Sequence, residues 1–168
     1  MIAVTRMRSL RLTGFSLVEL MIVVGLVATL FALAAPAFGG LIQRQRVESA
    51  SDALQAGIAL ARVEAVRRGQ RVEVRPLPCD RGGWNCGWAV GVAGTTAVIR
   101  TVEVDPTLTL ERLSGSGAYV VGPRAGAGAV RFRFAAGPSA SPVEHFLCHT
   151  AAGGFRSTRV LTECDDDA

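Results

Sequence analysis

Two histidines and a cysteine lie close together near the C-terminus of the 168-residue chain, as His145, Cys148 and His149. Their H-x-x-C-H spacing differs from the C-x-x-C-H of c-type haem attachment, because the first position is a histidine. Three potential ligands without a fourth nearby also make a weak zinc site, since structural zinc takes four. We therefore expect no metal and no cofactor, and interpret the two histidines as a surface pair.

Catalysis would require a nucleophile beside a base, paired carboxylates or a phosphate-binding loop. The sequence contains neither G-x-x-x-x-G-K-[ST] nor a G-x-G-x-x-G that opens a helix, and no other catalytic spacing is convincing. We expect no catalytic residues, and hence no enzyme.

The chain has an even set of four cysteines: Cys79, Cys86, Cys148 and Cys164. Such a set is typical of disulfides, which persist outside the cytoplasm, and sequence alone allows three pairings. We favour the local pairing, Cys79 with Cys86 and Cys148 with Cys164, because it closes short loops without requiring any long-range register.

A long apolar segment near the N-terminus contains one charge, Glu19. It reads G-F-S-L-V-E-L-M-I-V-V-G-L-V-A-T-L-F-A-L-A-A-P-A-F, and three arginines but no acidic residue precede it. Residues 15–38 would form a helix about 36 Å long, and a bilayer core of about 30 Å needs roughly 20 apolar residues. We expect 15–38 to span a membrane with the basic N-terminus in the cytoplasm. A carboxylate in such a segment is by default a functional group with a partner.

The motif G-F-S-L-V-E-L at the start of this segment resembles the processing site of type IV prepilins and type II secretion pseudopilins. The resemblance implies that a prepilin peptidase cuts between Gly14 and Phe15, so that residues 1–14 are a removed leader. It also implies that Phe15 is methylated, and that Glu19 serves assembly and methylation by meeting the α-amino group of Phe15 in a neighbouring subunit. An ordinary single-span anchor is the alternative. A secretory signal peptide does not fit this segment, because the apolar part of such a peptide has only 7 to 15 residues.

Helical periodicity follows the apolar segment, and residues 39–69 are predicted to continue the helix in amphipathic form. Apolar or small residues recur at three- and four-residue steps: Val47, Ala50, Leu54, Gly57 or Ile58, Ala61 and Ala65. The opposite face is charged and is interpreted as solvated: Arg44, Arg46, Glu48, Asp52, Arg62, Arg67 and Arg68. Gly69 stands where a C-terminal cap is expected.

From Gln70 onward the apolar pattern alternates instead, which predicts a β-rich domain over residues 70–168. A first strand is expected near Val72 and Val74. Further strands are expected at about 87–92, 96–104, 107–113, 118–121, 129–135, 143–149 and 154–161. The sequence therefore predicts an α+β fold, in which a long N-terminal helix packs on antiparallel sheets.

Residues 61–74 narrow the resemblance to one family within the pilins. Their sequence, A-R-V-E-A-V-R-R-G-Q-R-V-E-V, resembles the GspH/FimT group of minor pilins and pseudopilins. Membership implies a pilin-like fold and a role in assembling a type IV pilus or a type II secretion pseudopilus. The implied partners are other pilins, the prepilin peptidase and the inner membrane, with the C-terminal domain in the periplasm. A membrane-anchored periplasmic binding domain and a DNA receptor for natural transformation are the alternatives.

The DNA-binding alternative depends on the segment between the last two cysteines. DNA-binding members of the FimT group carry a C-terminal G-R-x-R motif, whereas here Gly154 is followed by Phe155, Arg156, Ser157, Thr158 and Arg159. Arg156 and Arg159 are the candidate phosphate contacts, but an odd separation directs them to opposite faces of a strand. Without residues 1–14 the chain has 15 arginines against 14 acidic residues, which is not the balance of a strongly basic nucleic-acid protein.

Overall fold

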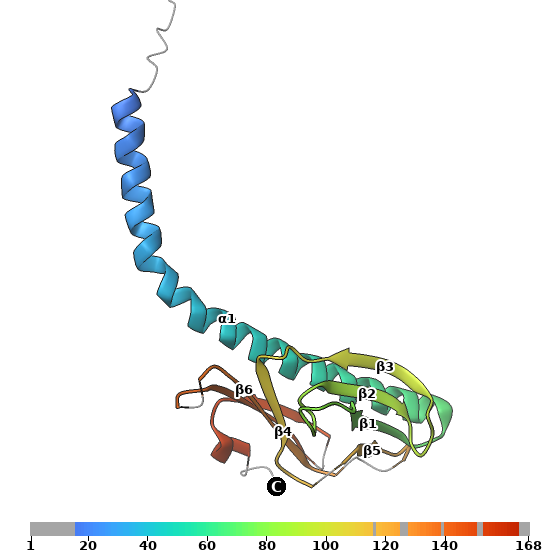
Figure 1. Cartoon of the computed structure of the whole chain (residues 1–168). Coiled ribbons are helices and arrows are strands. Elements are labelled where there is room, and N and C mark those ends of the chain that lie inside the picture. The colour runs from blue at the N-terminus through green and yellow to red at the C-terminus, as the bar shows by residue number, and fades with distance from the viewer. Residues whose placement is uncertain (1–15, 116, 125–127, 139, 151–152, 165–168) are drawn as a thin grey trace, which may run out of the picture. The chain divides into compact units, whose positions relative to one another are not determined.

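The computed structural model describes residues 16–115, 117–124, 128–138, 140–150 and 153–164, except for the side chains of 33–37. The chain divides into two compact units, Met1–Phe38 and Gly39–Ala168. Within the first unit the structure describes the beginning of a long helix. Within the second it describes the rest of that helix and two antiparallel sheets (Figure 1).

Helix α1 runs from Leu17 to Arg68. It begins after Ser16, whose Oγ accepts a hydrogen bond from the Val18 N–H at 3.2 Å, as an N-cap does. The helical backbone continues through Pro36. The helix ends at Gly69, which has a φ of 64°, the left-handed conformation predicted for the cap.

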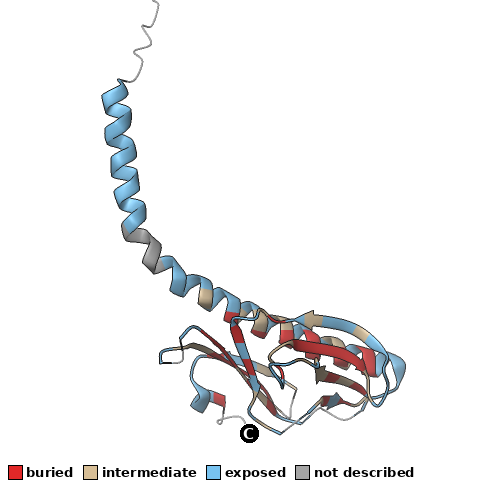
Figure 2. Cartoon of the chain, in the orientation of Figure 1, coloured by how far each residue is buried: buried red, intermediate tan, exposed pale blue. Residues whose placement is uncertain are grey.

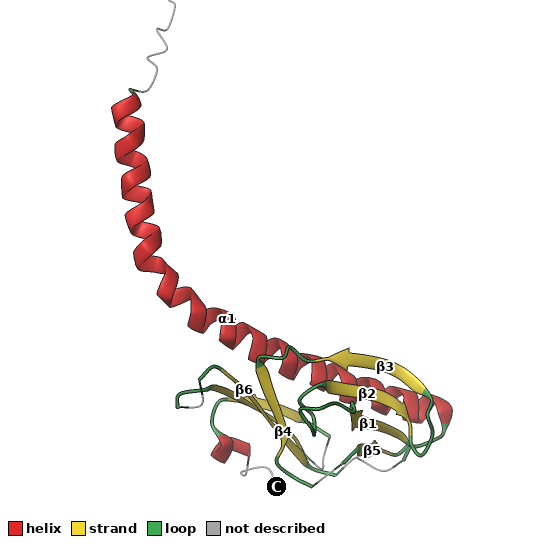
Figure 3. Cartoon of the chain, in the orientation of Figure 1, coloured by secondary structure: helices red, strands yellow, loops and turns green. Residues whose placement is uncertain are grey.

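The described residues of the second unit form eight strands in two four-stranded sheets (Figure 3). The strands are β1 (Val72–Pro76), β2 (Gly87–Val92), β3 (Val98–Glu103), β4 (Leu108–Arg112), β5 (Tyr119–Val121), β6 (Val130–Ala136), β7 (Val143–His149) and β8 (Phe155–Thr158). One sheet has the order β3-β2-β1-β5 and the other β4-β6-β7-β8, and all neighbouring strands are antiparallel. The predicted α+β fold is therefore confirmed.

The larger of two apolar clusters among the described residues joins the second half of α1 to both sheets (Figure 2). The helix contributes Val47, Leu54, Ile58, Ala61 and Ala65. Trp88 of β2 and Phe132 of β6 are completely buried in the same core. Gly57 of α1 permits this close packing, because a Cβ on it would lie 2.8 Å from the Trp88 Nε1.

The predicted final strand, 154–161, begins one residue too early and extends three residues too far. β8 ends at Thr158, and a 3-10 helix, η1, follows at Leu161–Cys164. The Thr158 side chain accepts a hydrogen bond from the Val160 N–H at 3.1 Å, which stabilises a turn instead of a strand. The turn brings Cys164 back to Cys148 of β7, to which it is disulfide-bonded.

Candidate functional site

The described start of α1 is an apolar helix whose large side chains are exposed to solvent. Leu17, Met21 and Phe31 are 74%, 68% and 70% exposed, and Glu19 is exposed among them. A chain gains no hydrophobic stabilisation from such a surface until another apolar phase covers it. Gly14 and Phe15, the predicted processing residues, lie outside the described residues.

Among the residues that the structure describes, no helix offers an apolar stretch long enough to cross a membrane.

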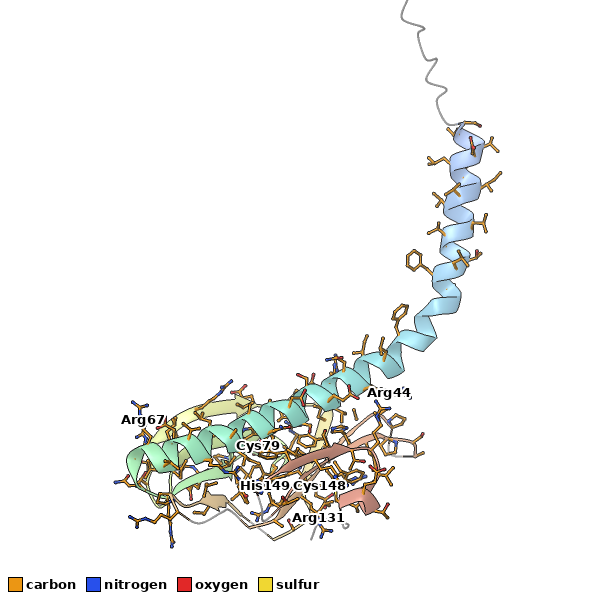
Figure 4. The ribbon with its side chains drawn as sticks, turned by 180° about the vertical axis from the view of Figure 1, so that it is seen from behind. Arg44, Arg67, Cys79, Arg131, Cys148 and His149 are labelled. Carbon is orange, nitrogen blue, oxygen red and sulfur yellow. A yellow bond between two sulfur atoms is a disulfide. The ribbon has the colours of Figure 1, made fainter. Side chains whose placement is uncertain are left out.

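The second unit contains two disulfides among its described residues, and they have the local pairing that the sequence analysis favoured. Cys79 is bonded to Cys86 and Cys148 to Cys164, with Cα atoms 6.2 and 5.8 Å apart. Cys79 and Cys148 are labelled in Figure 4. Within the first loop, the Asn85 Oδ1 accepts a hydrogen bond from the Leu110 N–H at 2.9 Å. This contact ties the loop to the edge strand β4.

Arg156 and Arg159, the candidate DNA contacts, are directed to different parts of the protein. The Arg156 Nη1 donates to the carbonyl oxygen of Glu163 in η1 at 3.1 Å. The Arg159 Nη2 donates to the Glu48 Oε1 of α1 at 2.8 Å, and this hydrogen bond lowers the pKa of Glu48. The two arginines are therefore hydrogen-bonded to different elements, Arg156 to η1 and Arg159 to α1. Asp165, Asp166 and Asp167 lie outside the described residues.

His149 is buried, so the interpretation of the two histidines as a surface pair is wrong. Its Nε2 lies 2.7 Å from the Arg62 Nη2 and its Nδ1 lies 2.9 Å from the Tyr119 hydroxyl. Because a guanidinium can only donate, Nε2 must accept and Nδ1 carries the proton. The Tyr119 hydroxyl then donates to the Gly128 carbonyl at 3.1 Å. Burial lowers the pKa of His149 and raises the pKa of Tyr119 to about 12.

Arg62 takes part in this cluster although it lies on the predicted solvated face of the helix. It is half-buried, and its Nη1 also donates to the Gly153 carbonyl at 3.1 Å. The hydrogen bonds of Arg62 connect α1 to β7 and to the turn before β8. Periodicity could not identify this role, because the partners are about 90 residues away in the sequence.

His145 is also buried, on the side of β7 that faces α1. Its Nε2 makes a short hydrogen bond with the Ser157 Oγ, and its electrostatic neighbours are Glu48, Asp52 and Arg159. Burial is the largest influence and lowers the pKa of His145. Among the described residues, no group of three His, Cys, Asp or Glu side chains could hold a metal ion.

The arrangement of a long helix on two antiparallel sheets is that of a pilin. Two crystal structures of the type IV minor pilin FimU from Pseudomonas aeruginosa share it. One matches with a TM-score of 0.54 at 23% identity over 66% of this chain and 91% of that one. The other matches with a TM-score of 0.57 at 22% identity over 70% and 92%. At such identities the likeness shows the fold.

The family is shown by the sequence itself. Residues 50–162, more than half of the chain, match the family described as Type II transport protein GspH. The protein belongs to this family, and the resemblance found in its motifs is confirmed. No curated protein sequence matches the chain.

Proposed function

We propose that this protein is a minor pilin or pseudopilin that helps to assemble a type IV pilus or a type II secretion pseudopilus. In this proposal residues 1–14 are a leader removed by prepilin peptidase, and residues 15–38 anchor the subunit in the inner membrane. Residues 39–69 continue the helix, and 70–168 form the periplasmic domain. Family membership and the pilin fold support the class of protein.

The observation that carries the assembly role is the contrast between the two units. The second unit has a complete core of its own, whereas the described apolar side chains of the first are exposed. Such a surface is stabilised by lipid before assembly and by the helices of other subunits afterwards. A domain attached to an apolar helix of this kind fits a filament subunit that is first held in a membrane.

Glu19 fits the same proposal. Among the described residues it has no ion-pair partner, and its helical neighbours are apolar. A carboxylate in such surroundings is stabilised only when a cation reaches it. We propose that this cation is the α-amino group of Phe15 of the neighbouring subunit, which cleavage after Gly14 would create.

The test of processing is the intact mass of the protein extracted from membranes. We expect the unmodified protein to lack residues 1–14 and to carry one additional methyl group. Gly14→Leu should retain the leader, because a bulky residue would replace the glycine at the proposed cleavage site. Gly25→Ala is the matched control, since a Cβ there meets nothing within 4 Å, and it should be processed normally. An uncleaved unmodified protein would favour a simple membrane-anchored binding domain.

DNA binding by Arg156 and Arg159 is tested by titrating the full-length protein in detergent with duplex DNA at low salt. Two phosphate contacts would give a salt slope of about −1.8. We expect an Arg156→Ala, Arg159→Ala double variant to bind no less DNA than the unmodified protein, because each arginine is already hydrogen-bonded within the domain. Arg44→Ala, Arg67→Ala removes the same charge from α1 and is the control. A loss confined to the first double variant would instead favour a DNA-uptake role.

A further inference from the structure

Two arginines lie on either side of Cys148, on the face of the β4-β6-β7-β8 sheet that points away from the core. Cys148 of β7 pairs with Arg131 of β6 and with Arg156 of β8. Residues directly opposite each other in antiparallel strands share a face, with Cβ atoms about 5 Å apart. Leu147 and His149, the sequence neighbours of Cys148, are buried on the side of the core and of α1. Cys148 and the two arginines therefore point to the outer face, because side chains alternate along a strand.

We call Arg131 and Arg156 the basic pair, and the 3-10 helix η1 ends beside it. Cys164, the last residue of η1, is bonded to Cys148 with their Cα atoms 5.8 Å apart, and both are buried in a small cluster on this outer face. The Arg156 Nη1 donates to the Glu163 carbonyl at 3.1 Å, which holds its guanidinium at the same end of η1. Arg131 lies close to Cys148 in Figure 4. The residues after Cys164 therefore start next to both arginines.

These next residues are all acidic. Asp165, Asp166 and Asp167 follow Cys164 directly, and we call them the acidic segment. An extended residue spans at most about 3.6 Å, so all three lie within about 11 Å of Cys164. Adjacent carboxylates repel one another unless a cation compensates them. A guanidinium suits this purpose, since it can bind a carboxylate through two parallel hydrogen bonds. The acidic segment thus matches the basic pair in charge and in reach.

The described carboxylates on the outer face have other partners. Glu111 and Glu144 both contact Arg133 of β6. The Glu163 carboxylate accepts a hydrogen bond from the Thr158 hydroxyl. These acidic residues are therefore already engaged, whereas the acidic segment is fixed beside the basic pair by the Cys148–Cys164 disulfide.

We propose that the acidic segment binds back onto the basic pair and so closes this surface to other anions. Exposed ion pairs are individually weak. The disulfide offsets this weakness, because a tethered group has a high effective concentration at a site within its reach. The contact is a property of the folded domain and does not depend on the assembly role proposed above.

Zero-length crosslinking tests the contact directly, because the chain contains no lysine. In Arg131→Lys or Arg156→Lys the only side-chain amine belongs to the basic pair, and a carbodiimide joins it only to a carboxylate that it touches. We expect the full-length protein in detergent to form an amide between this amine and the acidic segment. After reduction and trypsin digestion the linked peptide should contain residues 160–168. No link, or a link to Glu163 alone, would overturn the proposal.

Two further lysine variants are the controls. Arg67→Lys should link to Glu64 and shows that the reaction works, since the Arg67 Nη1 lies 3.4 Å from the Glu64 Oε1. Arg100→Lys is the matched negative control, because Arg100 is exposed on β3 of the other sheet. It should give no link to the acidic segment. Equal yields from Arg100→Lys and from the basic pair would mean that the segment has no preferred site, which would also overturn the proposal.

Retention on immobilised heparin, a polyanion, measures whether the surface is closed. Replacing all three aspartates of the acidic segment by asparagine should shift elution of the full-length protein to higher salt, because the basic pair becomes accessible. The shift should be largely lost when Arg131→Gln and Arg156→Gln are added. It should be retained when Arg67→Gln and Arg100→Gln, which change the net charge equally, are added instead. Equal shifts in these two backgrounds would show an effect of net charge only and would contradict the proposed closure.

Discussion

Gly87→Ala should lower the free energy of unfolding of the second unit by about 3 kcal/mol or more. Gly87 is the first residue of β2 and has a φ of 106°, a conformation that costs a residue with a Cβ about 1–3 kcal/mol. The added Cβ would also lie 2.0 Å from the Val102 carbonyl oxygen and 2.9 Å from the Glu103 Cα. Because both contacts are to the backbone of β3, they can be relieved only by moving that strand, and such overpacking costs about 1–3 kcal/mol more.

The measurement is denaturant unfolding of the full-length protein in detergent, followed by the fluorescence of the two buried tryptophans, Trp84 and Trp88. Gly94→Ala separates the two contributions, since Gly94 has a φ of 73° and a Cβ there would meet nothing within 4 Å. We expect this control to lose about 1–2 kcal/mol from backbone strain alone. Equal losses for the two variants would mean that the contact with β3 does not determine the effect.

The second unit should become less stable as the pH falls from 7.5 to 5.5. The pKa values of His145 and His149 are both lowered by burial from an ordinary value of 6.5. The unfolded chain therefore binds more protons than the folded one below about pH 6.5, so stability is lost as the pH falls through that value toward the folded pKa values. A histidine pKa lowered by 1 on folding corresponds to about 1.4 kcal/mol of unfolding free energy. At His149 a proton on Nε2 would in addition displace the hydrogen bond from Arg62.

Glutamine variants test the assignment of this pH dependence. A glutamine side chain is polar but cannot titrate. We therefore expect His149→Gln and His145→Gln each to reduce the change in unfolding free energy between pH 5.5 and 7.5, and the double variant to remove most of it. Glu48, Glu64 and Asp105 have lowered carboxyl pKa values, and their contribution is lost only at more acidic pH. A double variant that keeps the full slope in this window would contradict the role of the histidines.

Local sequence patterns predicted the helix and the eight strands of the second unit, but not the 3-10 helix η1. Val72 and Val74 alternate with polar residues, and both are fully buried in β1. Gly69 ends α1 because a left-handed residue was needed there. The pilin fold was predicted from the family motifs, because hydrophobic periodicity alone does not identify a particular fold. These predictions succeed because they depend on residues a few positions apart.

Contacts between distant residues were not predictable from the same patterns. Arg62 belongs to the charged face of the helix, yet it is half-buried and bonded to His149 and Gly153, about 90 residues away. Arg159 meets Glu48 across 111 positions of sequence. The order of strands in the two sheets depends on similar long-range pairings, as where β1 pairs with both β2 and β5. Propensity therefore predicts which segments are strands but not which strands meet.

The core formed by α1 and both sheets determines which proteolytic fragments could survive. A cut between Phe38 and Val47 would leave every buried helical residue attached to the sheets, and a folded domain could be shed from the cell envelope. A cut after Leu54 would remove Val47 and Leu54 from the core and leave the rest of the domain less stable and open to degradation. The position of the first cleavage would thus decide whether a subunit is released intact or destroyed.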